Sequence, residues 1–365
     1  MKTQIKKIIA LILCSAILLS IGATGAYANT DRKTTCGDDC EKSPVVILPG
    51  INHSPTYLYD ENNEPYLDAD GNEVGGTLLI LELSKLWGTL PALVGSLLGT
   101  LLLQHNTGLD KAAYKAASAA FWVQKCDEEG NHINNLQTQR WYHPISEMTE
   151  DDKDWLYRMI PLQAIEKEYG GDHIYLYTFN LVGDPMDSAD ELDEYIEMVK
   201  EQTGHDKVTL LPVSLGGTIL TAYLELMKDT GYTDINRIVN VVSCLQGTDV
   251  MGDFYLREFK INDPEHPEYE HFFFNEFLPM IMKESNDYGT LGYIINIALK
   301  IMPKKVVYAI LSGAVDGIVD TLMLYCPQFW AMIPTDRYED VKAMYYDRIW
   351  GDPECADLAQ TLDNF

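Results

Sequence analysis

Basic side chains are scarce in this chain. Its 365 residues include 27 Lys and Arg against 55 Asp and Glu, so the formal net charge at pH 7 is −28. A surface this acidic repels nucleic acids and anionic membrane headgroups, and it favours solubility. The composition therefore argues against a polyanionic partner, and we expect no nucleic acid among the ligands.

Sets of metal-binding side chains are also missing. One closely spaced cysteine pair, Cys36 and Cys40, has no second Cys/His pair at zinc-site spacing. The acidic stretch Asp68–Glu73 has glycine at its fourth position, whereas an EF-hand loop needs glycine at the sixth. Turn chemistry explains this stretch and the similar Asp60–Asn63 and Asp127–Gly130. We expect neither a metal nor another cofactor.

The longest apolar run lies at the N terminus, over Ile8–Ala26. It follows a basic start with three lysines and ends at Ala26-Tyr27-Ala28, which has small residues at the two positions that signal peptidase reads. This pattern predicts a secretory signal peptide over 1–28, cleaved after Ala28, then a linker over 29–43. A retained membrane anchor is the alternative. In a secreted chain, the six remaining cysteines can be oxidised.

Four short apolar runs predict buried strands of a parallel sheet, because they do not alternate with polar residues. They are Pro44–Pro49, His173–Phe179, Lys207–Val213 and Arg237–Cys244. A helical pattern with a capping box at Ser188 and Glu191 separates the second and third runs, and another helix follows the third run and stops at Gly231. This alternation predicts an α/β fold, with helices flanking the sheet.

The third strand runs directly into a serine and two glycines. Ser214 is followed by Leu215, Gly216 and Gly217, and a helical pattern begins there. In the G-x-S-x-G elbow, such a tight turn projects a nucleophilic serine above the sheet, and the helix N terminus favours the negative charge of acyl transfer. Pro212 stands where the first glycine is usual. A serine that merely caps a helix is the alternative to a nucleophile.

In these segments the chain resembles α/β-hydrolase lipases, most closely those related to lecithin:cholesterol acyltransferase. The similar stretches are Leu48–Ser54, Pro212–Gly217, Ile238–Thr248 and Phe329–Pro334. The resemblance implies hydrolysis or transfer of acyl groups of lipid-like esters through an acyl-enzyme. It implies Ser214 as nucleophile, with the backbone N–H of Leu215 and that of Ile51 or Asn52 as oxyanion donors.

Two long insertions interrupt the predicted hydrolase core over 44–250. The first spans 51–172 and includes Leu86–Gln104, an apolar stretch with Pro91 and three glycines that predicts a buried helical hairpin. The second, over 251–334, is again apolar, and a helical segment follows over 335–365. Such insertions are typical of a cap that shelters an apolar substrate and touches lipid surfaces transiently. Packing of a second core layer is the alternative.

The sequence offers no readily assigned catalytic base. In this fold the acid and then the histidine follow the serine, each after a further strand, but the sequence after Cys244 predicts none. Three explanations remain: the sequence ends before these strands, Asp249 and His271 complete an unusual triad, or the protein is an inactive relative that binds lipids or glycans. His53 precedes Ser214 and is expected to hydrogen-bond locally. A serine hydrolase with another acyl substrate also fits.

Overall fold

The computed structural model describes residues 42–51, 53–68, 71–76, 83–258 and 302–364. The chain forms two compact units. The sheet unit comprises Met1–Tyr57, Gly75–Leu78 and Gln137–Leu245, and the helical unit comprises Leu58–Val74, Leu79–Leu136 and Gln246–Phe365. The predicted insertion over 51–172 is therefore divided, because its last part belongs with the sheet.

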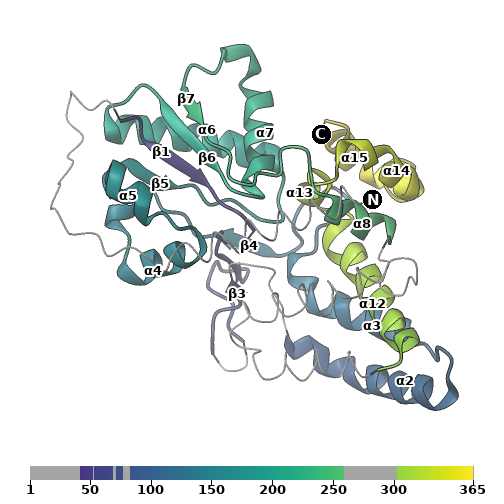
Figure 1. Cartoon of the computed structure of the whole chain (residues 1–365). Coiled ribbons are helices and arrows are strands. Elements are labelled where there is room, and N and C mark those ends of the chain that lie inside the picture. Colours follow the sequence, from purple (N-terminus) through teal and green to yellow (C-terminus); the bar gives the residue numbers. More distant parts are fainter. Residues whose placement is uncertain (1–41, 52, 69–70, 77–82, 259–301, 365) are drawn as a thin grey trace. The chain divides into compact units, whose positions relative to one another are not determined.

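A four-stranded parallel sheet is the centre of the sheet unit, and it confirms the predicted α/β fold (Figure 1). The strand order is β5-β1-β6-β7. Its members are β1 (Val45–Leu48), β5 (Ile174–Leu176), β6 (Val208–Pro212) and β7 (Ile235–Ile238). Every residue of β1, β5 and β6 is buried, as their apolar composition predicted. The predicted fourth strand begins and ends earlier than expected: β7 covers Ile235–Ile238, although the Val239 and Val241 N–H groups still donate to the Leu210 and Pro212 carbonyls of β6.

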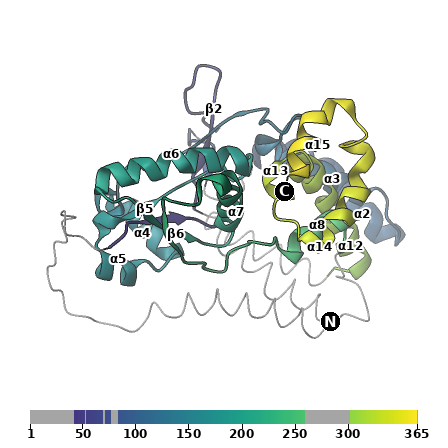
Figure 2. The ribbon, with the colours of Figure 1, turned by 90° about the horizontal axis from the view of Figure 1, so that it is seen from above.

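Helices cover both faces of this sheet, as Figure 2 shows from above. On one face are α6 (Pro185–Thr203) and α7 (Gly216–Leu226), and on the other are α4 (Glu150–Met159) and α5 (Gln163–Tyr169). The second face packs apolar side chains of α4 and α5 and their flanking segments against β1 and β5. Three short 3-10 helices complete the unit: η4 (Ile145–Glu147), η5 (Gly171–His173) and η6 (Lys228–Thr230).

The predicted capping box of α6 is wrong. The helix begins at Pro185, and the side chain of Asp184 caps it by accepting a hydrogen bond from the Met186 N–H at 2.8 Å. Proline is favoured at the first helical position because its missing N–H is not needed there. Ser188 is consequently a buried residue inside the first turns of the helix.

The predicted acidic turns have a common geometry. In each turn an aspartate carboxylate accepts the backbone N–H of the residue four positions later at 2.9 Å, from Asp60 to Glu64, Asp68 to Asn72 and Asp127 to Asn131. These aspartate side chains replace backbone acceptors within the turn, which is the role that aspartate has in Asx turns.

A second, small sheet has the order β3-β2-β4 and is made of β2 (Thr56–Tyr59), β3 (Gly75–Gly76) and β4 (Asn135–Thr138).

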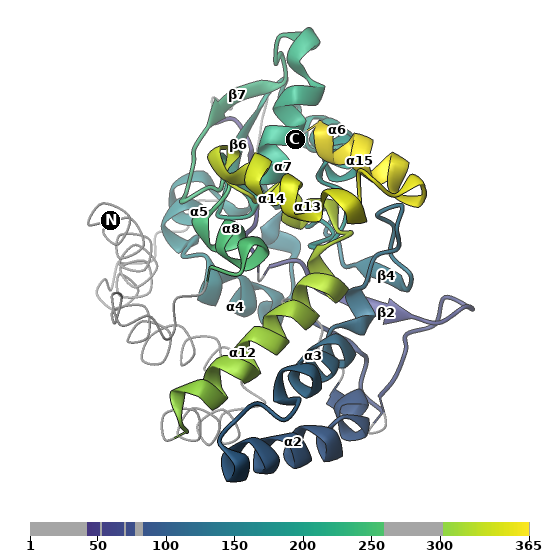
Figure 3. The same cartoon turned by 90° about the vertical axis from the view of Figure 1, so that its right-hand side faces the viewer.

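Helices form nearly all of the remaining described structure of the helical unit (Figure 3). They are η2 (Leu83–Gly88), α2 (Leu90–Leu103), α3 (Leu109–Ala120), η3 (Trp122–Gln124), α8 (Asp249–Leu256), α12 (Lys304–Ile318), the π-helical turn η9 (Val319–Met323), α13 (Pro327–Trp330), α14 (Thr335–Tyr345), η10 (Tyr346–Arg348), η11 (Pro353–Cys355) and α15 (Ala356–Asp363). The C-terminal segment is thus helical, as predicted. Helices α3 and α12 pack side by side because Gly313 and Gly317 leave no side chain between the two backbones.

The stretch Leu86–Gln104 is not the buried hairpin that its composition predicted. Residues Leu90–Leu103 form the single helix α2, which Pro91 starts rather than breaks. Leu93 and Leu97 pack inward, whereas Leu102 is 81% exposed. The described part of the helical unit therefore presents an apolar helix face at its surface.

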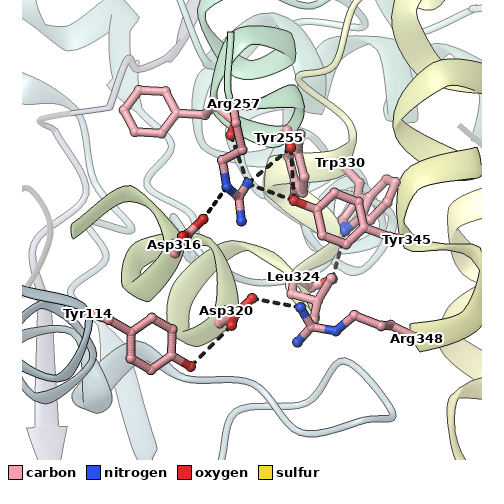
Figure 4. A network of polar contacts seen from close by, with 10 residues as sticks. Tyr114, Tyr255, Arg257, Asp316, Asp320, Leu324, Trp330, Tyr345 and Arg348 are labelled. Carbon is pink, nitrogen blue, oxygen red and sulfur yellow. Dashed lines mark hydrogen bonds and ion pairs between the residues drawn. The ribbon is translucent and has the colours of Figure 1, made fainter. Parts of the chain in front are cut away.

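Helix α12 and turn η9 form one described stretch, Lys304–Met323, that is long and apolar enough to cross a membrane by length and composition alone. Half of its most apolar window is buried inside the protein. Its two aspartates have specific partners (Figure 4): Asp316 pairs with Arg257, and Asp320 accepts hydrogen bonds from Tyr114 at 3.1 Å and Arg348 at 2.7 Å. The acidic groups of this helix are satisfied by the folded helical unit itself.

Candidate functional site

Ser214 lies in the turn between β6 and α7, where the sequence predicts the nucleophile. Its φ angle of 48° places it in the left-handed region, which non-glycine residues rarely adopt. The turn is held on both sides: the Ser214 N–H donates to the Val241 carbonyl at 3.0 Å, and its own carbonyl accepts the Cys244 N–H at 2.8 Å. Strain of this kind costs on the order of 1–2 kcal/mol and is found preferentially at functional sites.

Both glycines of the turn are sterically required. A Cβ at Gly216 would lie 2.1 Å from the Leu48 carbonyl oxygen, and a Cβ at Gly217 would lie 2.7 Å from the Cys244 nitrogen. The start of α7 is therefore packed between the end of β1 and the segment after β7. This close approach explains why the chain has two glycines immediately after the serine and its neighbouring leucine.

Pro212, the departure from the usual elbow sequence, fits as the last residue of β6. It has no N–H to donate, but its carbonyl accepts hydrogen bonds from the Val241 N–H at 3.0 Å and the Ser243 hydroxyl at 2.8 Å. The following N–H, that of Val213, donates to the Leu48 carbonyl at 2.8 Å. The sheet thus continues past the proline on both sides.

The predicted oxyanion loop passes close to the serine. A Cβ at Gly50 would lie 3.3 Å from the Ser214 Cβ and 3.9 Å from its Oγ. In the described part of the chain, no hydrogen bond has the N–H of Leu215 or Ile51 as its donor. Asn52, the third predicted donor, lies outside the described residues. Two backbone donors are thus available beside the end of β6.

The sequence did not predict that the Cys244 side chain is a neighbour of Ser214. The Cys244 thiol lies beside the Ser214 hydroxyl: burial raises the pKa of this thiol, and the neighbouring hydroxyl opposes that shift. Between Val241 and Cys244, Val242 has a left-handed φ of 47°, which is unusual for a β-branched residue. The order of the strands could have predicted this contact, because the segments that follow adjacent parallel strands lie at the same edge of the sheet.

His53 is buried beside this loop, and its local hydrogen bond is made by the backbone N–H, which donates to the Gly50 carbonyl at 3.3 Å. Its side chain is near the Trp155 ring, with ring centroids 5.7 Å apart, and only 6% of the residue is exposed. Neither ring nitrogen has a hydrogen-bond partner among the described residues. Desolvation by burial lowers the pKa of His53 to about 4, although the nearby Gly50 carbonyl opposes the shift. The imidazole is neutral at pH 7.

The two predicted triad partners of Ser214 do not belong to the described part of the sheet unit. Asp249 begins α8 in the helical unit, where its carbonyl accepts a 3.3 Å hydrogen bond from Arg337. His271 lies outside the described residues. The histidines described in the helical unit, His105 and His132, contact Leu103 and Cys126 instead of Asp249.

Over the described ranges, no group of three or more His, Cys, Asp or Glu side chains is placed to hold a metal ion. The carboxylate of Asp68, the first residue of the calcium-like stretch, accepts the Asn72 N–H within its own turn. Cys36 and Cys40 lie outside the described residues.

Comparison with known proteins adds no identification. No model of a protein family matches the sequence, and no curated protein matches it.

Proposed function

We propose that this protein is a secreted serine hydrolase that cleaves or transfers acyl groups of lipid-like esters through an acyl-enzyme on Ser214. The observation that carries the proposal is the left-handed Ser214 in the turn from a buried parallel strand to a helix, closed by Gly216 and Gly217. A serine that only caps a helix has no need of left-handed backbone, since helix N-caps adopt extended φ and ψ values. Strain at this position supports a chemical role.

The proposed chemistry follows from the groups around Ser214. Its Oγ loses its proton to a base and attacks the ester carbonyl. This attack gives a tetrahedral intermediate. The available N–H groups of Leu215 and Ile51 would stabilise the oxyanion of that intermediate. Collapse expels the alcohol and leaves the acyl group on Ser214, and water or another alcohol then accepts the acyl group. His271 and Asp249 remain the proposed base and acid.

The substrate class is supported by the sequence resemblance and by one surface feature. Helix α2 has no charged residue, and its Leu98, Leu102 and Leu103 are exposed. An uncharged leucine-rich face fits transient contact with a lipid surface better than contact with a polar substrate. The basic and apolar N terminus supports secretion.

A fluorophosphonate probe tests the proposal, because it reacts with activated serines. The full-length protein should be labelled, Ser214→Ala should not be, and Ser146→Ala, a serine elsewhere in the sheet unit, should be labelled like the wild type. His271→Asn and Asp249→Asn should reduce labelling, whereas the neighbouring His266→Asn should not. A folded, full-length protein that no fluorophosphonate labels would overturn the enzyme proposal.

The second candidate is a secreted binding protein that keeps the scaffold without catalysis. The Ser214–Cys244 contact favours it, because the serine hydroxyl has a thiol as its neighbour, and none of the described histidines is its hydrogen-bond partner. Binding of a lipid ester by Ser214→Ala and by the wild type with equal affinity, without turnover by either, would support this candidate. Turnover of p-nitrophenyl esters that depends on Ser214 would exclude it.

A further inference from the structure

The third acidic turn of the helical unit places a cysteine opposite a histidine. Asp127 closes this turn by accepting the N–H groups of Glu129 and Asn131 at 3.1 and 2.9 Å. Cys126 and His132, the residues that flank the turn, form an antiparallel bridge. Their side chains meet, with 3.8 Å between the Cys126 Sγ and the His132 Nδ1. The turn chemistry thus fixes the imidazole beside the sulfur.

A second cysteine, distant in the sequence, reaches the same sulfur. Cys326 is the N-cap residue of α13, and its thiol lies close enough to Cys126 for each thiol to shift the pKa of the other. The backbones also approach each other there, since a Cβ at Gly130 would lie 3.5 Å from the Tyr325 carbonyl oxygen and 3.4 Å from the Pro327 Cγ. Cys126 and Cys326 are 2% and 0% exposed, respectively.

The surroundings divide the roles of the two sulfurs. The Cys326 thiol and His132 lower the pKa of Cys126, with the thiol as the larger influence, while burial raises the pKa of Cys326. A thiolate, not a thiol, is the nucleophile of disulfide exchange. The turn that sets His132 beside Cys126 is local and can form before the unit packs, so Cys126 is suited to attack an oxidant first, and Cys326 to resolve the mixed disulfide.

We propose that Cys126 and Cys326 form a disulfide bond in the secreted protein. The oxidant is a disulfide of an export-compartment oxidoreductase or of a small thiol such as glutathione. The Cys126 thiolate attacks one sulfur of that disulfide and releases the other as a thiolate, which takes up the proton that Cys326 loses. The Cys326 thiolate then attacks the Cys126 sulfur and releases the second group as a thiolate, which takes up the proton that Cys126 lost on ionising. The two cysteines are oxidised by two electrons, and the oxidant is reduced to two thiols.

The bond forms during folding, because both sulfurs are inaccessible to an oxidoreductase once the unit has packed. It joins the segment before β4 to the segment that starts α13, and so ties together two parts of the helical unit that are far apart in the sequence. The inference rests on the proposed secretion and not on the chemistry of Ser214.

Cys355 provides a matched control. It is also buried in the helical unit, but its thiol donates to the Arg348 carbonyl at 3.5 Å. Cys244 is in the sheet unit, next to Ser214. Neither cysteine has the thiol and imidazole neighbours that Cys126 has.

The test is peptide mapping by mass spectrometry under non-reducing conditions, on full-length protein recovered after secretion. We expect one peptide pair that joins Cys126 to Cys326, lost on reduction and absent from Cys126→Ser, but present in Cys355→Ser. Reduction should lower the melting temperature of the wild type by at least about 5 °C, since a disulfide across a long loop removes much unfolded-state entropy.

A second experiment tests the pairing of Cys126 with Cys326 independently of secretion. The reduced, unfolded full chain is refolded in a glutathione redox buffer and then alkylated in denaturant. Protection of both Cys126 and Cys326 supports the bond even when the chain is made in the cytosol. Alkylation of both residues after refolding, or pairing of Cys126 with a different cysteine, would overturn the proposal.

Discussion

The Leu48 carbonyl oxygen at the end of β1 lies directly against Gly216, so that a Cβ at that glycine would be only 2.1 Å away. This contact joins the first strand of the sheet to the first residue of α7. The carbonyl is also the acceptor for the Val213 N–H at 2.8 Å, so it cannot move without breaking the sheet. The position of Ser214 between Val213 and Gly216 depends on this one approach of backbone to backbone.

Gly216→Ala should consequently be among the most destabilising single-methyl additions in this protein. We expect a loss of roughly 3 kcal/mol or more in the free energy of unfolding, because the added atom meets backbone that cannot rotate away. Gly95→Ala is the control: this exposed glycine of α2 has no atom within 4 Å of an added Cβ, and it should gain about 0.5–1 kcal/mol. Urea denaturation measures both. Equal stability of the two variants would contradict this account of the turn.

Ser214→Gly should be more stable than Ser214→Ala. Both variants lose the hydroxyl and its contact with Cys244, so their difference isolates the left-handed backbone at φ 48°. Glycine adopts this conformation without a Cβ clash, and we expect it to exceed alanine by about 1 kcal/mol. Thermal unfolding of the two proteins gives the comparison. An alanine variant at least as stable as the glycine variant would mean that the turn is not strained.

The protein should become less stable as the pH is lowered, because of the titration of His53. Its pKa is lowered from 6.5 to about 4 in the folded protein, so between these values the unfolded chain binds a proton that the folded chain does not. The slope of the unfolding free energy with pH is then positive, and the stabilisation is complete above about pH 6.5 and lost as the pH falls to about 4. The full effect is on the order of 3 kcal/mol.

His53→Gln and His53→Phe test this dependence, because neither side chain titrates in that range. Urea denaturation at several pH values from 7 to 4.5 should show a flatter curve for both variants than for the wild type. Carboxylates that titrate near pH 4 contribute equally to all three proteins and cancel in the difference. Parallel curves for wild type and variants would show that His53 is solvated in the folded state.

Arg257→Lys should destabilise the helical unit despite the retained charge. The guanidinium pairs with Asp316 and donates to the Tyr345 hydroxyl at 2.7 Å and to the Phe254 and Tyr255 carbonyls at 2.9 and 3.0 Å. An ammonium group cannot reach these acceptors in their several directions, so we expect a loss of about 1–3 kcal/mol.

Lys228→Ala is the surface control for that prediction. Lys228 forms an exposed pair with Glu225 three positions earlier, and its removal should leave the free energy of unfolding nearly unchanged, because solvent screens such a pair. Chemical denaturation monitored by tryptophan fluorescence would report both variants. A cost for Arg257→Lys no greater than that for Lys228→Ala would show that the network in Figure 4 does not contribute to stability.

Local sequence patterns predicted the parts of the fold that depend on neighbouring residues. The runs at Val45–Leu48 and Val208–Pro212 are strands because continuous apolar residues suit a sheet covered on both faces. Asp60, Asp68 and Asp127 form turns because a short carboxylate bonds its own backbone. The Ser-Leu-Gly-Gly stretch predicted a strand-to-helix turn at Ser214, because small residues directly after a strand allow a tight turn.

Errors arose where packing competes with composition. The N-cap of α6 is Asp184 and not the predicted Ser188, because Pro185 is a favourable first helical residue and the helix therefore begins about one turn earlier. The apolar stretch Leu86–Gln104 predicted a buried hairpin, but only one side of α2 has partners in the described part of its unit. Composition reports how apolar a helix is, and the number of neighbours available to cover it depends on the rest of the unit.

The sequence alone therefore determined the α/β class, the four-strand succession and the place of Ser214 at the end of a buried strand. Only the tertiary structure decided the left-handed φ of Ser214, its contact with Cys244, the burial of His53 and the meeting of Cys126 with Cys326. Each of these joins residues that are far apart in the chain, or depends on such a contact. Their proximity follows from how strands and helices pack, which short-range periodicity and turn chemistry do not specify.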